Sequence, residues 1–132
     1  MRAIIVKQPG GAEQLKIVKR AKPIPQENEL LIKVKAIGVN RHDIITREQN
    51  TDQSILGVEV AGIVEKSSPH SSIAVGERVM GLVQGGYAEY ATIPDDRAML
   101  IPENLSFEQA AAINETSASI HGTESEYWKN YC

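Results

Sequence analysis

The feature that most constrains the fold is a series of short apolar runs between residues 2 and 102, separated by turn-forming residues that include several glycines and prolines. Proline has no amide donor for a sheet and glycine weakens a strand interior, so such residues mark strand ends. Several runs mix apolar with charged residues, as ELLIKVKAIGV does, which is typical of antiparallel strands with one face toward solvent. The sequence therefore predicts a mainly β barrel or sandwich, with strands at 2–7, 15–20, 29–39, 55–66, 76–83, 87–93 and 98–102.

Two segments have the features of short helices. NRHDIITREQ, at 40–49, lies between predicted strands and begins with Asn40, a residue type that is favoured as a helix N-cap. SFEQAAAI, at 106–113, begins with Ser106, and Gln109 follows three residues later, which is the spacing of a capping box. We therefore expect one or two short helices beside the strands.

Length and charge limit the classes of function. The 132 residues suit one domain, and the formal net charge is −3, with 14 basic and 17 acidic side chains. No stretch concentrates lysine and arginine, so the sequence disfavours a nucleic-acid partner, whose phosphates would need such charge. No apolar run approaches the roughly 20 residues that cross a bilayer. We expect a cytoplasmic protein with no membrane partner and, because Cys132 is the only cysteine, no intramolecular disulfide.

Standard motifs for phosphate, metal or nucleophile chemistry are absent from the sequence. The ten glycines form no G-x-G-x-x-G pattern, and the pairs at 10–11 and 85–86 fit turns better than a dinucleotide-binding loop. The three histidines, at 42, 70 and 121, have no spacing that would gather them into a metal site. No G-x-S-x-G elbow marks a nucleophilic serine. We expect no metal ion in this chain.

Several longer motifs stand in a characteristic order. After MRAIIVKQPGGAEQLKI come GVNRHDIITRE, ILGVEVAGIVE and GGYAEYATIPDDRAMLIPENLSFEQAAAI. Together they resemble the N-terminal GroES-like domain of the medium-chain dehydrogenase/reductase superfamily, and most of all its quinone oxidoreductase branch. The resemblance implies a GroES-like antiparallel β-barrel without a Rossmann domain. It covers residues 1–116, and residues 117–132 form a divergent C-terminal tail.

The resemblance also implies roles for individual residues. Asn40 would face the nicotinamide end of the cofactor and the substrate, Asp43 would lie near the same cleft, and Ser119 would replace a threonine that touches the cofactor. Asn40 and Val58 stand where zinc-dependent members have metal ligands, which implies a zinc-independent enzyme. For Asn40 and Asp43 a structural alternative stays open, in which the first caps its helix and the second interacts with the helix dipole.

Two departures from the branch concern the pocket and the exit from the domain. Ile44, Ile45 and Thr46 stand where relatives often have a tyrosine, and Asn114 stands where a proline is typical. The resemblance then implies a truncated form of an NADPH-dependent quinone oxidoreductase, inactive as a reductase because the nucleotide-binding domain is missing. The alternative is a non-catalytic interaction or regulatory isoform that self-associates or pairs with full-length subunits through an uncovered apolar surface.

Overall fold

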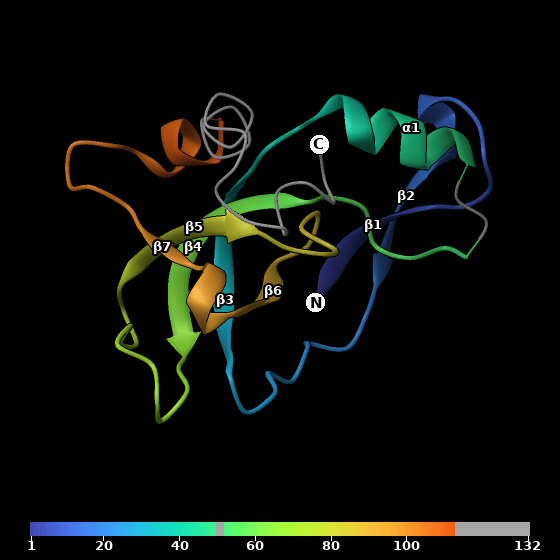
Figure 1. Cartoon of the computed structure of the whole chain (residues 1–132). Coiled ribbons are helices and arrows are strands. Elements are labelled where there is room, and N and C mark those ends of the chain that lie inside the picture. Colours follow the sequence, from blue (N-terminus) through green and yellow to red (C-terminus); the bar gives the residue numbers. More distant parts are fainter. Residues whose placement is uncertain (50–51, 113–132) are drawn as a thin grey trace.

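The computed structural model describes residues 1–49 and 52–112, which form two antiparallel sheets (Figure 1). The smaller sheet pairs β1 (Arg2–Val6) with β2 (Leu15–Lys19). The larger sheet has five strands in the order β6-β3-β4-β5-β7. Their bounds are Glu29–Ile37 for β3, Glu59–Lys66 for β4, Arg78–Leu82 for β5, Tyr90–Pro94 for β6 and Met99–Leu100 for β7.

Helical segments are short. The helix α1 (Arg41–Gln49) follows β3, and residues 107–112 are helical before the described part ends. Two 3₁₀ turns, Ala12–Gln14 and Asp95–Arg97, connect strands. None of the described helices is long and apolar enough to cross a membrane.

The longest strand of the five-stranded sheet is β3, which lies between β4 and β6. Leu30, Leu31 and Ile32 are consecutive and all buried. Because successive side chains of a strand point to opposite faces, both faces of the sheet are covered at this point. The main apolar cluster gathers residues from β3, β4, β5 and β6 together with the loops around them: Leu30, Ile32, Val60, Val64, Ile73, Val79, Val83, Ala91 and Ile93.

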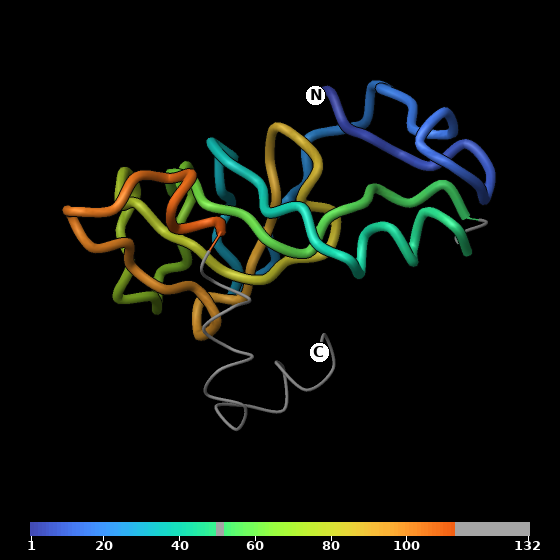
Figure 2. Tube along the Cα trace, turned by 90° about the horizontal axis from the view of Figure 1, so that it is seen from above, coloured from blue at the N-terminus to red at the C-terminus, as the bar shows by residue number. Residues whose placement is uncertain are grey.

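Two further apolar clusters attach the remaining segments. One packs the buried Ala110 and Ala111 of the C-terminal helical segment against Ala61 of β4 and Ile101. The other joins β1 to two loops through Val6, Leu56 and Tyr87. Figure 2 shows the result: β1, β2 and α1 lie at one end of the molecule, and most of the five-stranded sheet lies at the other.

The segments around residues 55 and 87 connect these two ends. The backbone nitrogen of Ile4 donates to the carbonyl of Tyr87 at 2.8 Å, and the backbone nitrogen of Leu56 donates to the carbonyl of Ile4 at 3.2 Å. Single antiparallel bridges also pair Ala3 with Ala88 and Ile5 with Ile55. The strand β1 is therefore held against the two loops that approach the candidate site described below.

The mainly β, antiparallel class with few helices is confirmed. The edges of the larger sheet are β6 and β7, and within the described residues no pairing closes this sheet into a barrel. The predicted strand 55–66 begins later, at Glu59, because Gly57 adopts φ +101 and turns the chain.

Candidate functional site

The candidate site lies where β3 passes into α1. Asn40 is the residue immediately before the helix, and Asp43 lies in its first turn. The backbone nitrogen of Asp43 donates to the carbonyl of Asn40 at 2.9 Å, and the backbone nitrogen of Asn40 donates to Oδ2 of Asp43 at 2.9 Å. A carboxylate near a helix N-terminus is also favoured by the helix dipole. This local pair fixes the backbone of Asn40 at the start of the helix.

Asp43 is a buried acid, only 5% exposed. Besides the backbone of Asn40, its Oδ2 accepts a hydrogen bond from the hydroxyl of Tyr87 at 2.7 Å. A buried carboxylate needs such donors, because without them its transfer out of water is strongly unfavourable. The tyrosine therefore satisfies Asp43 from a loop that lies 44 residues further along the chain.

Tyr87 is itself buried, and its pKa is raised above the usual value of a phenol. The main cause is burial, which disfavours the phenolate, and the hydrogen bond to Asp43 and the charge of Asp43 act in the same direction. Tyr87 is thus a hydrogen-bond donor over the ordinary pH range. Gly57 makes room for the ring, since a Cβ there would lie 2.5 Å from Cδ1 of Tyr87.

The side chain of Asn40 contacts a second carboxylate. Its Nδ2 donates to Oε2 of Glu59 at 3.1 Å, and Glu59, the first residue of β4, is 1% exposed. The backbone nitrogen of Gly38 donates to the carbonyl of Glu59 at 2.9 Å. A Cβ at Gly38 would lie 2.7 Å from Cδ and Oε1 of Glu59, so the glycine allows the carboxylate to occupy this space.

The structure thus brings together two residues that the sequence predicted and two that it did not. Asn40 and Asp43 are in direct contact, and the side-chain amide of Asn40 donates a hydrogen bond to Glu59. The sequence analysis gave no role to Glu59, which follows Val58 directly, and it placed Tyr87 in a strand. The single acid within the apolar run ILGVEVAG was the available signal for a buried carboxylate.

Other predicted positions lie away from this cluster or beyond the described part. Ser119 and His121 are outside the described residues. His42 lies on the exposed side of α1, and His70 lies in a turn after β4. Among residues 1–49 and 52–112, no group of three histidine, cysteine or acidic side chains is placed to hold a metal ion.

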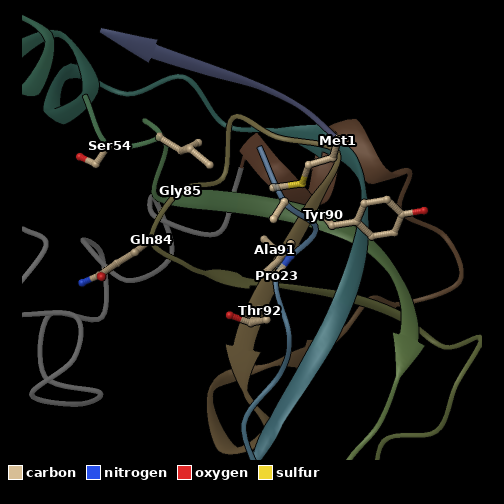
Figure 3. A pocket seen from close by; sticks show the side chains of 10 residues that line it. Met1, Pro23, Ser54, Gln84, Gly85, Tyr90, Ala91 and Thr92 are labelled. Atoms are coloured by element: carbon tan, nitrogen blue, oxygen red, sulfur yellow. The ribbon is translucent and has the colours of Figure 1, made fainter. Parts of the chain in front are cut away.

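A cavity of about 300 Å³ lies beside β6, on a different part of the surface (Figure 3). Met1, Tyr90 and Ala91 lie at one side of it, and Ser54 and Gln84 lie at the other. Neither Asn40 nor Asp43 lines it. A second hollow, of about 240 Å³, includes Tyr87 together with Ile37 and residues of β1.

Comparison with known proteins agrees with this architecture. Residues 26–103, more than half of the chain, match the family model of the alcohol dehydrogenase GroES-like domain. Over 122 residues the chain is 44% identical to quinone oxidoreductase from Sus scrofa, which covers 86% of this chain and 37% of that protein. It is 36% identical over 119 residues to the synaptic vesicle membrane protein VAT-1 homolog-like from Homo sapiens, with coverage of 85% and 28%.

Among solved structures, the chain is similar to the Escherichia coli quinone oxidoreductase complexed with NADPH. The TM-score is 0.85 at 32% sequence identity, and the match covers 98% of this chain and 42% of that chain. The chain therefore spans less than half of the length of each of these relatives.

Proposed function

Because the chain belongs to the family of the alcohol dehydrogenase GroES-like domain, we propose that it forms the substrate-side wall of the cleft of an NADPH-dependent quinone oxidoreductase. The observation that carries this proposal is the hydrogen-bonded cluster of Asn40, Asp43, Glu59 and Tyr87. Three of its members are buried, while Asn40 is only partly buried. The cluster therefore holds one partly exposed neutral amide against three buried side chains.

The proposed role of this amide is orientation. Hydride transfer from a reduced nicotinamide to a quinone requires the two rings to be close and aligned, and the protein contributes chiefly that alignment. The Asn40 amide can bind a carbonyl or a carboxamide without supplying a proton. Asp43 would act through the backbone of Asn40, and Tyr87 would act through Asp43. Zinc has no part in this proposal.

NADPH is the cofactor that we propose for the reaction. The donor set fits one end of it, because an asparagine amide has both an acceptor and donors, as the nicotinamide carboxamide has. The relative from Escherichia coli is described as complexed with NADPH. We propose that the substrate is a quinone-type small molecule, as the names of the relatives suggest for those proteins.

We further propose that residues 1–116 form this wall, that residues 117–132 are a separate tail, and that Ser119 approaches the cofactor. The 132-residue chain would then have little or no reductase activity of its own, because its sequence has no glycine-rich dinucleotide loop. Titration of NADPH into the purified chain by calorimetry should give no saturable binding, and no steady quinone-dependent oxidation of NADPH should follow. Saturable binding near one per chain would contradict this proposal.

A chimera tests the role of the wall. Residues 1–112 would replace the matching part of the Escherichia coli quinone oxidoreductase, which keeps its own nucleotide-binding part. We expect the chimera to reduce 1,4-benzoquinone with NADPH, and we expect Asn40→Ala to lower kcat/KM by about tenfold or more. The exposed Asn28 gives the matched control, Asn28→Ala. A folded chimera whose quinone reduction is insensitive to Asn40→Ala would contradict the proposed function.

A second candidate is an interaction role without catalysis. The observation that favours it is the exposure of three large apolar side chains next to or on α1: Val39 is 75% exposed, Ile44 is 43% exposed and Ile45 is 45% exposed. Where exposed apolar side chains form a contiguous patch, such a patch commonly marks an association surface. In this case the occupant would be a second copy of the chain.

A further inference from the structure

The direction of the Asn40 amide is set by its contact with Glu59. A carboxyl oxygen that accepts a hydrogen bond meets the nitrogen of an asparagine amide and not its oxygen. The recorded contact, Nδ2 of Asn40 to Oε2 of Glu59 at 3.1 Å, has this polarity. Because oxygen and nitrogen lie on opposite sides of the amide carbon, Oδ1 of Asn40 is then the atom turned away from Glu59.

Glu59 is well placed to hold that direction. It begins β4 opposite Leu82, its carbonyl accepts from the backbone nitrogen of Gly38, and its side chain is buried. The absence of a side chain at Gly38 leaves the carboxylate in close contact with the backbone that leads to Asn40. The strand and the segment before α1 are therefore fixed relative to each other at the position of the contact.

The backbone of Asn40 is held separately. Its nitrogen donates to Oδ2 of Asp43 at 2.9 Å, and Tyr87 donates to the same oxygen at 2.7 Å. One carboxylate thus fixes the backbone of Asn40, and the other fixes its side chain. Because Asn40 is held both at its backbone and at its side-chain amide, it loses little further conformational entropy when a ligand binds.

We propose that Glu59 is a positioning residue that turns Oδ1 of Asn40 toward the ligand, so that Asn40 binds a hydrogen-bond donor. The matching group is a primary carboxamide, such as that of nicotinamide, because its NH₂ donates to Oδ1. A quinone oxygen is only an acceptor and does not match this atom. The inference rests on the proposed function and names the part of the reacting pair that Asn40 contacts.

Exchanging the amide and the carboxylate between positions 40 and 59 tests the orientation of the Asn40 amide in the full 132-residue chain. Asn40→Asp places two carboxylates in contact, so we expect the folding equilibrium constant to fall by about tenfold or more. Glu59→Gln in the Asn40→Asp background supplies an amide NH₂ to the new carboxylate, and stability should largely return. Asn28→Asp, at an exposed asparagine, should change stability little. If the double variant is no more stable than the two single effects combined, the polarity assigned to the pair is wrong.

Nuclear magnetic resonance of the same chain tests the ligand class without any need for turnover. The Asn40 side-chain NH₂ signal should lie apart from that of Asn28, and it should move in Glu59→Gln. Nicotinamide should then shift the Asn40 signal, whereas 3-acetylpyridine, which lacks the NH₂, should shift it much less. Equal shifts with both compounds, or none with nicotinamide up to its solubility limit, would overturn the assignment to a carboxamide. An inactive chimera would instead count against the proposed function. It would not affect the stability and magnetic resonance tests of the Asn40 orientation.

Discussion

At the scale of single residues, the site depends on one buried acid that accepts two hydrogen bonds. The local donor is the backbone of Asn40, and the distant donor is Tyr87. A hydrogen bond to a charged group typically contributes about 1.5–3 kcal/mol to stability. We therefore expect the hydrogen bond from Tyr87 to stabilise the buried Asp43 about as much as the hydrogen bond from the backbone of Asn40.

Tyr87→Phe should remove the distant donor and leave the ring in place. We expect the free energy of unfolding at neutral pH to fall by about 1.5–3 kcal/mol, because Asp43 stays buried with fewer donors. Urea denaturation followed by circular dichroism gives the measurement. A change of only a few tenths of a kcal/mol would mean that Asp43 is satisfied without the tyrosine.

The same bond predicts a dependence on alkaline pH. Burial and Asp43 raise the pKa of Tyr87 in the folded chain above its unfolded value, which is about 10. The neutral phenol is thus favoured by folding, and its contribution is complete below pH ~10 and is lost as the pH rises toward the folded pKa. The unfolding free energy of the wild type should therefore fall more steeply above pH ~10 than that of Tyr87→Phe. If the unfolding free energies of the two proteins fell in parallel above pH ~10, the raised pKa assigned to Tyr87 would be wrong.

The residues of the site differ in how far the sequence could predict them. Asn40 and Asp43 are three positions apart, so a local motif was sufficient to pair them. Glu59 and Tyr87 are separated from their partners by 19 and 44 positions, and their contacts depend on how β4 and the loop before β6 pack. Alternation of apolar residues predicts that a segment is a strand, but it does not predict which loop a buried hydroxyl will reach.

At the scale of elements, local signals were accurate where the interaction itself is local. Ser106 and Gln109 form the expected reciprocal pair: the backbone nitrogen of Ser106 donates to Oε1 of Gln109 at 2.9 Å, and that of Gln109 donates to Oγ of Ser106 at 3.0 Å. By contrast, the expected strand at 87–93 begins only at Tyr90, because residues 87–89 turn to contact β1. A tertiary contact changed that boundary.

Ser106→Ala should weaken the segment at 107–112. The lost N-cap hydrogen bond typically costs about 1 kcal/mol, and Ala110 and Ala111 of this segment pack on β4. Urea denaturation should show that loss, and amide hydrogen exchange should be faster at Ala110, whose nitrogen donates to the carbonyl of Ser106. Asn104→Ala, an exposed change just before the helix, serves as the control. Unchanged exchange at Ala110 would show that packing alone holds the segment.

At the scale of the whole molecule, the distribution of apolar surface is uneven. The five-stranded sheet buries its side chains on both faces near its centre, while Val39, Ile44 and Ile45 remain exposed beside Asn40. Apolar surface removed from water is worth about 25 cal/mol per Å², so three such side chains favour association if a partner covers them together. The site and the association surface would then share the start of α1.

Self-association should therefore depend on α1. We expect sedimentation velocity of the 132-residue chain to show a coefficient that rises with protein concentration, and we expect Ile44→Ser to reduce that rise because it removes apolar area without adding charge. Ile24→Ser is the matched control, since Ile24 is 83% exposed and lies in the loop before β3. If the two variants lower association equally, the contact is unspecific, and a wild-type chain that remains monomeric at every concentration would leave the exposed residues of α1 without a role in self-association.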